Sequence, residues 1–145
     1  MKKFYRISLF LIIFSLSFTF QSKSFASKYG TGELKLTKSM VDYFIQYIRG
    51  KQFKFPADFY VTIDGTDGVS WYCAEMTNCN PGSLSQDLAQ CSRVTGKECK
   101  KFARKRTIKW NNGINPGKGK KSRINSKWSD QEIIDKLIEL GFYQN

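Results

Sequence analysis

Four cysteines in a chain without histidine place the strongest constraint on the fold. They stand at Cys73, Cys79, Cys91 and Cys99, so the spacings are C-x5-C and C-x7-C with eleven residues between the pairs. Structural zinc sites usually take their ligands from closer C-x2–4-C pairs, which makes zinc the weaker interpretation. In an oxidising compartment an even number of cysteines favours two disulfides, for which three connectivities exist. We expect nearest-neighbour pairing, Cys73 with Cys79 and Cys91 with Cys99.

Residues 1–26 have the pattern of a cleaved signal peptide. Three basic residues in the first six positions precede an uncharged, mostly apolar run of fourteen residues at 7–20. Ser24 and Ala26 supply the small residues of a cleavage site before Ser27. The apolar run is shorter than the roughly 20 residues that span a bilayer, and no cysteine stands at the cleavage point to accept a lipid. We expect a periplasmic or secreted mature chain of 119 residues without a transmembrane helix.

The mature chain carries a large positive surplus. Lysine and arginine number 24 against 12 acidic residues, and four of the basic residues belong to the signal peptide, which leaves a net charge of +8. Such a surplus favours anionic partners, namely nucleic acid, lipid headgroups or acidic polysaccharide. Solubility alone is the alternative explanation of this charge.

Hydrophobic periodicity divides the next part of the chain into six elements. Apolar residues at helical spacing predict two helices, and alternation of apolar and polar residues predicts four strands. Ser39 and Asp42 resemble a capping box in the first helix, and Gly50 and Gly96 stand where the two helices should end. The expected elements are a helix in 36–50, strands at 59–63 and 69–73 joined by a turn at 64–68, a helix in 83–94, and strands at 98–103 and 107–110.

This order predicts an α+β fold with about four antiparallel strands and with the helices packed on one face of the sheet. Phe59, Val61 and Ile63 alternate along their strand and are expected on one face of it. Cys91 lies at the end of a helix and Cys99 at the start of the next strand, so a bond between them would clamp helix to sheet. Closing this nine-residue loop contributes roughly 2–3 kcal/mol on the chain-entropy model.

Twelve positions within 59–110 form a pattern of glycine, cysteine and aromatic residues. It resembles a cysteine-containing module of small secreted bacterial proteins, mostly of unknown function. The resemblance covers under half of the chain and implies a compact disulfide module with no catalytic residues to carry over. The matching residues are Gly68, Trp71, Tyr72, Cys73, Cys79, Cys91, Gly96, Cys99, Phe102, Ala103, Ile108 and Trp110.

The chain changes character after position 110. Residues 111–127 are rich in glycine, asparagine and lysine and contain little apolar material, which predicts a flexible basic linker. Ser129 and Glu132 then form a capping box, and Gly141 resembles a Schellman stop. Between them runs an apolar stripe of Ile133, Ile134, Leu137, Ile138 and Leu140. The expected divisions are a signal peptide at 1–26, a disulfide-stabilised α+β domain at 27–110, the basic linker at 111–127 and a docking helix at 128–145.

Ten basic residues are candidates for one anion-binding surface. Six of them fall within ten positions on the last two expected strands and their bend, and four lie in the expected linker. Alternation places Lys105 and Lys109 on the opposite face from Phe102 and Trp110, while the arginines at the bend can reach outward. The candidates are Lys100, Lys101, Arg104, Lys105, Arg106, Lys109, Lys118, Lys120, Lys121 and Arg123.

Catalytic interpretations find little in the sequence. Histidine, the commonest general base and metal ligand, is absent, and no serine stands in a G-x-S-x-G motif. Asp64 and Asp67 flank glycines in the expected turn and fall well short of an oxygen cage for calcium. We therefore expect no enzyme activity, no cofactor and no bound metal.

Two functional hypotheses stay open. The first is an exported, non-catalytic binding module whose basic surface engages an anionic polymer or an envelope surface. The second is an envelope protein-interaction or accessory module that docks on a protein partner through its Trp128–Phe142 helix, with the charge only solubilising. Such a helix is too short to be stable alone in water, so it must dock either on its own domain or on a partner. A third hypothesis, a small hydrolase or an inhibitor of one, lacks a recognisable site.

Overall fold

The structure is a computed structural model, and it describes residues 27–52, 54–75, 79 and 83–144. Seven helices and strands follow one another in this part of the chain. The elements are α1 Lys38–Arg49, β1 Phe55–Thr62, β2 Gly68–Cys73, α2 Leu84–Thr95, β3 Cys99–Arg104, β4 Thr107–Ile108 and α3 Asp130–Glu139. The strands form one antiparallel sheet in the order β2-β1-β3-β4. The predicted α+β fold with a four-stranded antiparallel sheet is confirmed, and the expected signal peptide at 1–26 lies outside the described residues.

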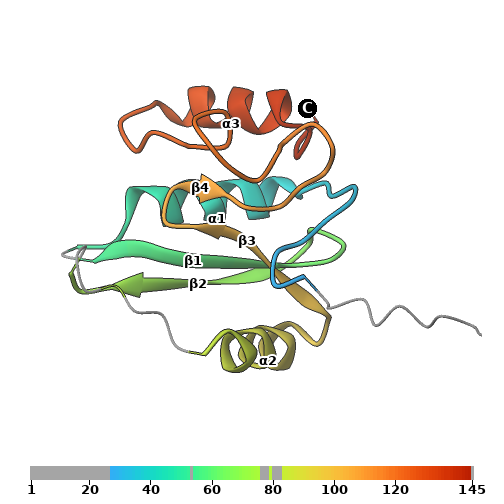
Figure 1. The fold of residues 1–145 in the computed structure, drawn as a ribbon. Helices are drawn as coiled ribbons and strands as arrows, with labels where there is room; N and C mark the ends of the chain where they lie inside the picture. Colours follow the sequence, from blue (N-terminus) through green and yellow to red (C-terminus); the bar gives the residue numbers. More distant parts are fainter. Residues whose placement is uncertain (1–26, 53, 76–78, 80–82, 145) are drawn as a thin grey trace, which may run out of the picture.

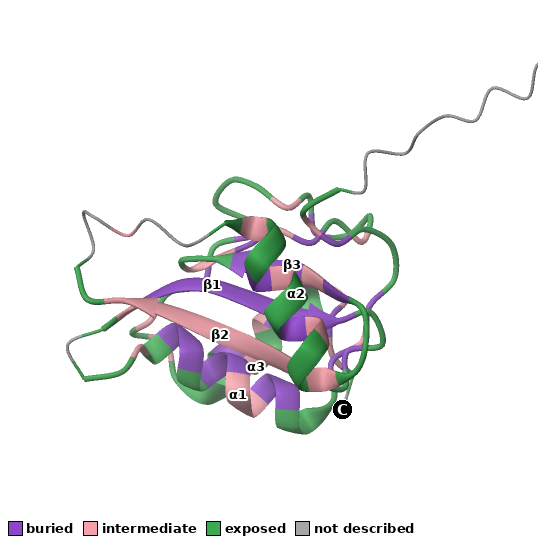
Figure 2. Ribbon diagram, turned by 90° about the horizontal axis from the view of Figure 1, so that it is seen from below, coloured by how far each residue is buried: buried purple, intermediate pink, exposed green. Residues whose placement is uncertain are grey.

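The sheet lies between helices on both of its faces (Figure 1). α1 and α3 pack on one face and α2 on the other, which differs from the expectation of helices on one face. The sequence of β1 explains this arrangement, because every residue of Pro56–Thr62 is buried and successive side chains point to opposite faces of the sheet (Figure 2). Both faces of this strand are therefore covered. Phe59 packs in the core with α1, whereas its neighbour Tyr60 packs with Cys91 of α2. Ile63, expected to continue the alternation, follows the strand and is 51% exposed.

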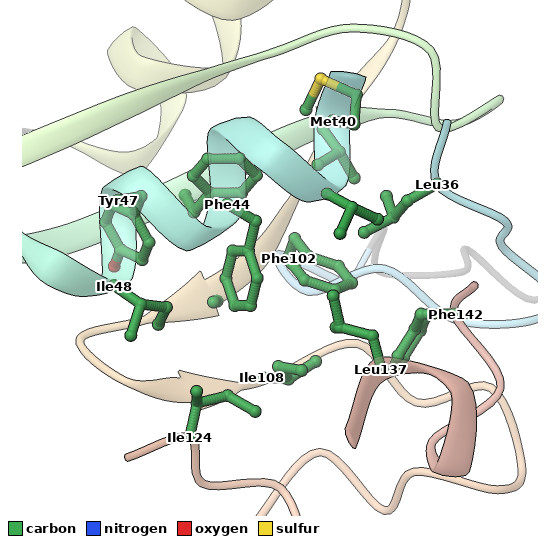
Figure 3. Packing of buried hydrophobic residues seen from close by; sticks show 14 of the residues in the cluster. Leu36, Met40, Phe44, Tyr47, Ile48, Phe102, Ile108, Ile124, Leu137 and Phe142 are labelled. Atoms are coloured by element: carbon green, nitrogen blue, oxygen red, sulfur yellow. The ribbon is translucent and has the colours of Figure 1, made fainter. Parts of the chain in front are cut away.

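Phe102 of β3 stands in the middle of the main hydrophobic core (Figure 3). The centre of its ring lies 5.2 Å from that of Phe44 in α1 and 5.0 Å from that of Phe142, which follows α3. Both contacts are edge-to-face, the arrangement that aromatic quadrupoles favour. The same core therefore joins α1, the sheet and α3.

The first helix begins two residues before the predicted capping box. Thr37 is the N-cap, and its hydroxyl accepts the backbone N–H of the residue three positions further on, at 3.4 Å. The capping box predicted from Ser39 and Asp42 was wrong, because Asp42 instead forms an ion pair with Lys38 at 2.9 Å. Gly50 is the C-cap residue, as predicted.

Residues 111–127 fold back over the core. Ile124, Asn115 and Ser122 are fully buried. The Asn115 amide donates to the carbonyl of Trp110 at 2.6 Å, and the Ser122 hydroxyl donates to the Asn115 side-chain oxygen at 2.6 Å. The expectation of a flexible linker does not describe this segment, because paired buried polar groups take the place of the apolar side chains that the sequence lacks.

The C-terminal helix docks on its own domain. Ser129 and Glu132 form the predicted capping box, with each side chain bonded to the backbone N–H of the other residue. The backbone N–H groups of Gly141 and Phe142 close the helix end by reaching back to carbonyls of its last turns, as predicted for a Schellman stop. The fully buried apolar residues of this region are Ile133, Leu137, Leu140 and Phe142.

Both predicted disulfides are present. Cys91–Cys99 joins α2 to the start of β3, and Cys73–Cys79 begins at the end of β2. Among the residues that the structure describes, no helix has the length and apolar character to cross a membrane.

Asp64 organises the turn between β1 and β2. Its carboxylate accepts hydrogen bonds from the hydroxyls of Thr62 and Thr66 at 2.6 and 2.8 Å and lies 2.7 Å from the Lys97 ammonium. The pKa of the Asp64 carboxyl lies well below its ordinary value. The hydrogen bond from Lys97 makes the largest contribution, and those from Thr62 and Thr66 come next. We expect Asp64→Asn to lower the free energy of unfolding at neutral pH.

The pH dependence of this loss has a definite sign. Because the pKa of Asp64 is depressed in the folded state, the stabilisation is complete above the unfolded pKa of about 3.9 and is lost as the pH falls toward the folded pKa. The difference in free energy of unfolding between the parent protein and Asp64→Asn should therefore shrink below about pH 4. Urea denaturation across a pH series measures it, and a difference that persists unchanged into strong acid would contradict this role.

Candidate anion-binding cleft

The turn between β3 and β4 is fixed by hydrogen bonds of its own backbone. Lys105 has a φ of 51°, a left-handed conformation that few non-glycine residues adopt. Its N–H donates to the carbonyl of Ala57 in β1 at 2.7 Å, and its carbonyl accepts from the Tyr47 hydroxyl of α1 at 2.8 Å. These bonds offset the conformational cost and set the position of the next residue, Arg106.

The Tyr47 hydroxyl stays protonated and donates its hydrogen bond to this turn at neutral pH. Burial is the main cause that raises the pKa of Tyr47 above its ordinary value, and the negative charge of Asp58 adds to it, while the cation of Arg106 acts in the opposite direction. The phenol therefore stays protonated across the neutral pH range and keeps its hydrogen bond to the turn.

Residues 122–124 run beside β4 and bring a second arginine next to the first. The N–H of Ile124 donates to the carbonyl of Arg106 at 2.8 Å, and Thr107 forms an antiparallel bridge with Arg123. This short ladder is the reason that two arginines separated along the sequence become neighbours.

Two adjoining cavities open beside the ladder, with volumes of about 310 Å³ and about 380 Å³. Arg106 and Arg123 line both cavities, so we call the two together the basic cleft. The first cavity is lined by Phe55, Pro56, Cys79, Lys105, Arg106, Thr107 and Arg123. The second is lined by Arg106, Lys120, Arg123, Ile124, Asn125, Ser126, Trp128 and Lys136.

The positive charge of the basic cleft is largely uncompensated. Among the described residues that line the two cavities none is acidic, and positions 99–128 hold eleven basic residues and no acidic one. Lys136 forms an ion pair with Glu139 at 2.8 Å. The cleft cations that form no ion pair with a carboxylate in the described part of the chain are Lys105, Arg106, Lys120 and Arg123.

Three of the predicted anion-binding residues, all on β3, line neither cavity of the basic cleft. Lys101 is only 6% exposed, and its ammonium lies 2.8 Å from the Asp58 carboxylate, so its place in a surface cluster was wrong. The cause is that α2 covers this side of β3, which leaves no solvent face there. Arg104 is exposed and lies opposite Asp58 on β1. Lys100 pairs with Glu98 at 2.9 Å and lines a separate cavity.

Lys109, Lys118 and Lys121 line neither cavity of the basic cleft. The Lys121 ammonium donates instead to the carbonyl of Ile114 at 2.9 Å. The predicted residues that the fold does bring together are Lys105, Arg106, Lys120 and Arg123. Sequence reasoning missed Lys136, because no local pattern relates a residue of α3 to the turn after β3.

The basic cleft combines two guanidinium groups with one aromatic side chain in each cavity. A guanidinium group is planar and presents paired donors that match carboxylate, phosphate or sulfate oxygens. Phe55 in one cavity and Trp128 in the other supply apolar surface. In the described part of the chain no group of three or more cysteine or acidic residues could hold a metal ion.

Comparison of the chain with protein-family models, with curated proteins and with solved structures found no match. The resemblance to a cysteine-containing secreted module therefore stays a prediction.

Proposed function

We propose that this protein is an exported, non-catalytic module that binds an anionic polymer in the basic cleft. The observation that carries the proposal is that Arg106 and Arg123 line two adjoining cavities and have no carboxylate partner among the described residues. Two cavities that share two arginines suit a chain with repeated negative groups. Each cavity receives one group, and the arginine pair lies between them.

A polymer fits the surroundings of the cleft better than a single small anion does. Lys118 and Lys121 are exposed on the same segment as Lys120, so a longer chain can meet further cations outside the cleft. Each such interaction releases a counterion and adds binding free energy that depends on salt. The two disulfides are compatible with export to an oxidising compartment.

The decisive variant removes the two shared charges, Arg106→Gln together with Arg123→Gln. We expect its affinity for heparin, a sulfated polysaccharide, to fall at least about tenfold at low salt, because hydrogen bonds to charged groups are each worth about 1.5–3 kcal/mol. The slope of log affinity against log salt concentration should decrease by about two, one for each arginine replaced. Titration calorimetry at several salt concentrations measures both quantities, and thermal unfolding verifies that the fold is retained.

A variant of equal net charge serves as the control. Lys28→Gln together with Arg93→Gln removes two exposed cations that do not line the cleft. This variant should bind heparin nearly as the parent protein does. If both double variants weaken binding equally, net charge and not the cleft is responsible. If neither changes binding, the charges are solubilising and the protein-interaction hypothesis takes precedence.

A further inference from the structure

The two disulfides lie in contrasting surroundings. Cys91 and Cys99 are 0% and 3% exposed and pack against Tyr60 beneath α2. Cys73 and Cys79 are half-buried, and Cys79 lines the first cavity of the basic cleft. Exchange requires that a thiolate reach a sulfur atom of the disulfide. Of the two bonds, Cys73–Cys79 is therefore the one open to attack in the folded protein.

Cys79 shares its cavity with three cations. Lys105, Arg106 and Arg123 line the same space, and no acidic residue among the described ones does. Positive surroundings attract an incoming thiolate and stabilise sulfur in its anionic form. We propose that Cys73–Cys79 is a thiol–disulfide exchange site at which the basic cleft selects small thiols that carry carboxylates.

The size of the cavity agrees with a ligand of this class. About 310 Å³ is at the lower end of the range of small-molecule sites, which suits a short peptide thiol. Its carboxylates meet Arg106 and Arg123 while its sulfur faces Cys79. The inference goes beyond polymer binding and does not depend on it, since the exchange needs only the cations of the first cavity.

The exchange proceeds in two balanced steps. The small thiolate attacks the Cys79 sulfur, a bond forms between these two sulfurs, and the Cys73–Cys79 bond breaks. Cys73 leaves as a thiolate and takes a proton from water. A second small thiolate then attacks the sulfur of the bound small thiol and releases Cys79 as a thiolate, which is protonated in turn. Two small thiols are oxidised to one disulfide, and the protein disulfide is reduced to two thiols.

Selection in this site comes from charge. A cleft lined by one sign of charge raises the local concentration and the association rate of an oppositely charged reactant by about ten- to a thousandfold. Salt screens this attraction, with a screening length of about 10 Å at 0.1 M ionic strength. In a neutral site, thiolates would differ only by their intrinsic nucleophilicity.

The test compares glutathione, which carries two carboxylates, with cysteamine, which carries none and has an ammonium group. The oxidised full chain is treated with each thiol, the freed cysteines are alkylated, and mass spectrometry follows each disulfide in time. Per unit of thiolate, glutathione should open Cys73–Cys79 at least about tenfold faster than cysteamine at low salt. The preference should disappear at high salt, and Cys91–Cys99 should stay closed in the folded protein.

Variants link the preference to the cleft. The double variant Arg106→Gln with Arg123→Gln should abolish the preference for glutathione over cysteamine, and Lys105→Gln should reduce this preference. The control variant Lys28→Gln with Arg93→Gln should keep it. Equal rates for the two thiols in the parent protein, or earlier opening of Cys91–Cys99, overturn the proposal. Heparin affinity measured on the same samples separates the two functions: heparin binding without a thiol preference refutes the exchange site and leaves polymer binding intact.

Discussion

Replacing Lys101 with methionine is expected to lower the free energy of unfolding by about 3–5 kcal/mol. The ammonium of Lys101 lies 2.8 Å from the Asp58 carboxylate and 5.2 Å from the centre of the Tyr60 ring, and Asp58 is fully buried. The second carboxylate oxygen of Asp58 has no hydrogen-bond partner among the described residues. Without the ammonium, an uncompensated carboxylate would remain between the sheet and α2, where no partner offsets the free-energy cost of its desolvation.

The matched control removes both charges. Asp58→Asn combined with Lys101→Met should recover part of the loss, because no uncompensated charge then remains, while the buried amide still lacks a full set of hydrogen-bond partners. Urea denaturation of the parent, the two single variants and the double variant gives a double-mutant cycle. If Lys101→Met alone stays within about 0.5 kcal/mol of the parent, as an exposed substitution would, the ion pair is not buried in solution.

Features that depend on near neighbours in the chain were predictable. The capping box of Ser129 and Glu132 and the helix stop at Gly141 are set by residues a few positions apart. Both disulfides also close short loops. Local spacing carries enough information for such features, because the groups meet as soon as the helix or turn forms. The first helix was an exception, because the spacing of Ser39 and Asp42 predicted a capping box there, whereas the N-cap is Thr37.

Strand alternation failed where a strand has a helix on each side. A lysine next to an inward-facing residue normally faces water in a sheet covered on one face. Lys101 is adjacent to Phe102, yet α2 covers the side on which it lies. Its partner Asp58 comes from another strand, so no local pattern could reveal the pair.

The basic cleft depends on contacts of the same non-local kind. Arg106 and Arg123 meet because residues 122–124 pair with β4, and the low apolar content of 111–127 gave no sign of that pairing. The basic composition predicted an anionic partner. Which four of the ten candidate anion-binding residues lie together in the basic cleft could be seen only from the fold.

Replacing Phe102 with alanine is expected to lower the free energy of unfolding by about 3–5 kcal/mol and to release α3 in particular. The ring lies between Phe44 of α1 and Phe142 beyond α3, with centre distances of 5.2 and 5.0 Å (Figure 3). Alanine would leave a cavity at this junction. α3 has ten residues, a length at which an isolated helix is marginal in water, so its order depends on docking.

Urea denaturation measures the overall loss, and native-state hydrogen exchange shows whether the amides of α3 lose protection before those of α1. Val94→Ala on α2 is the control, because Val94 is 63% exposed and should change stability by no more than about 0.5 kcal/mol. Phe142→Ala should loosen α3 in the same way, and the two core substitutions together should destabilise by less than their sum, since both remove the same ring pair. If α3 keeps its protection in Phe102→Ala, then its docking depends on residues other than this aromatic junction.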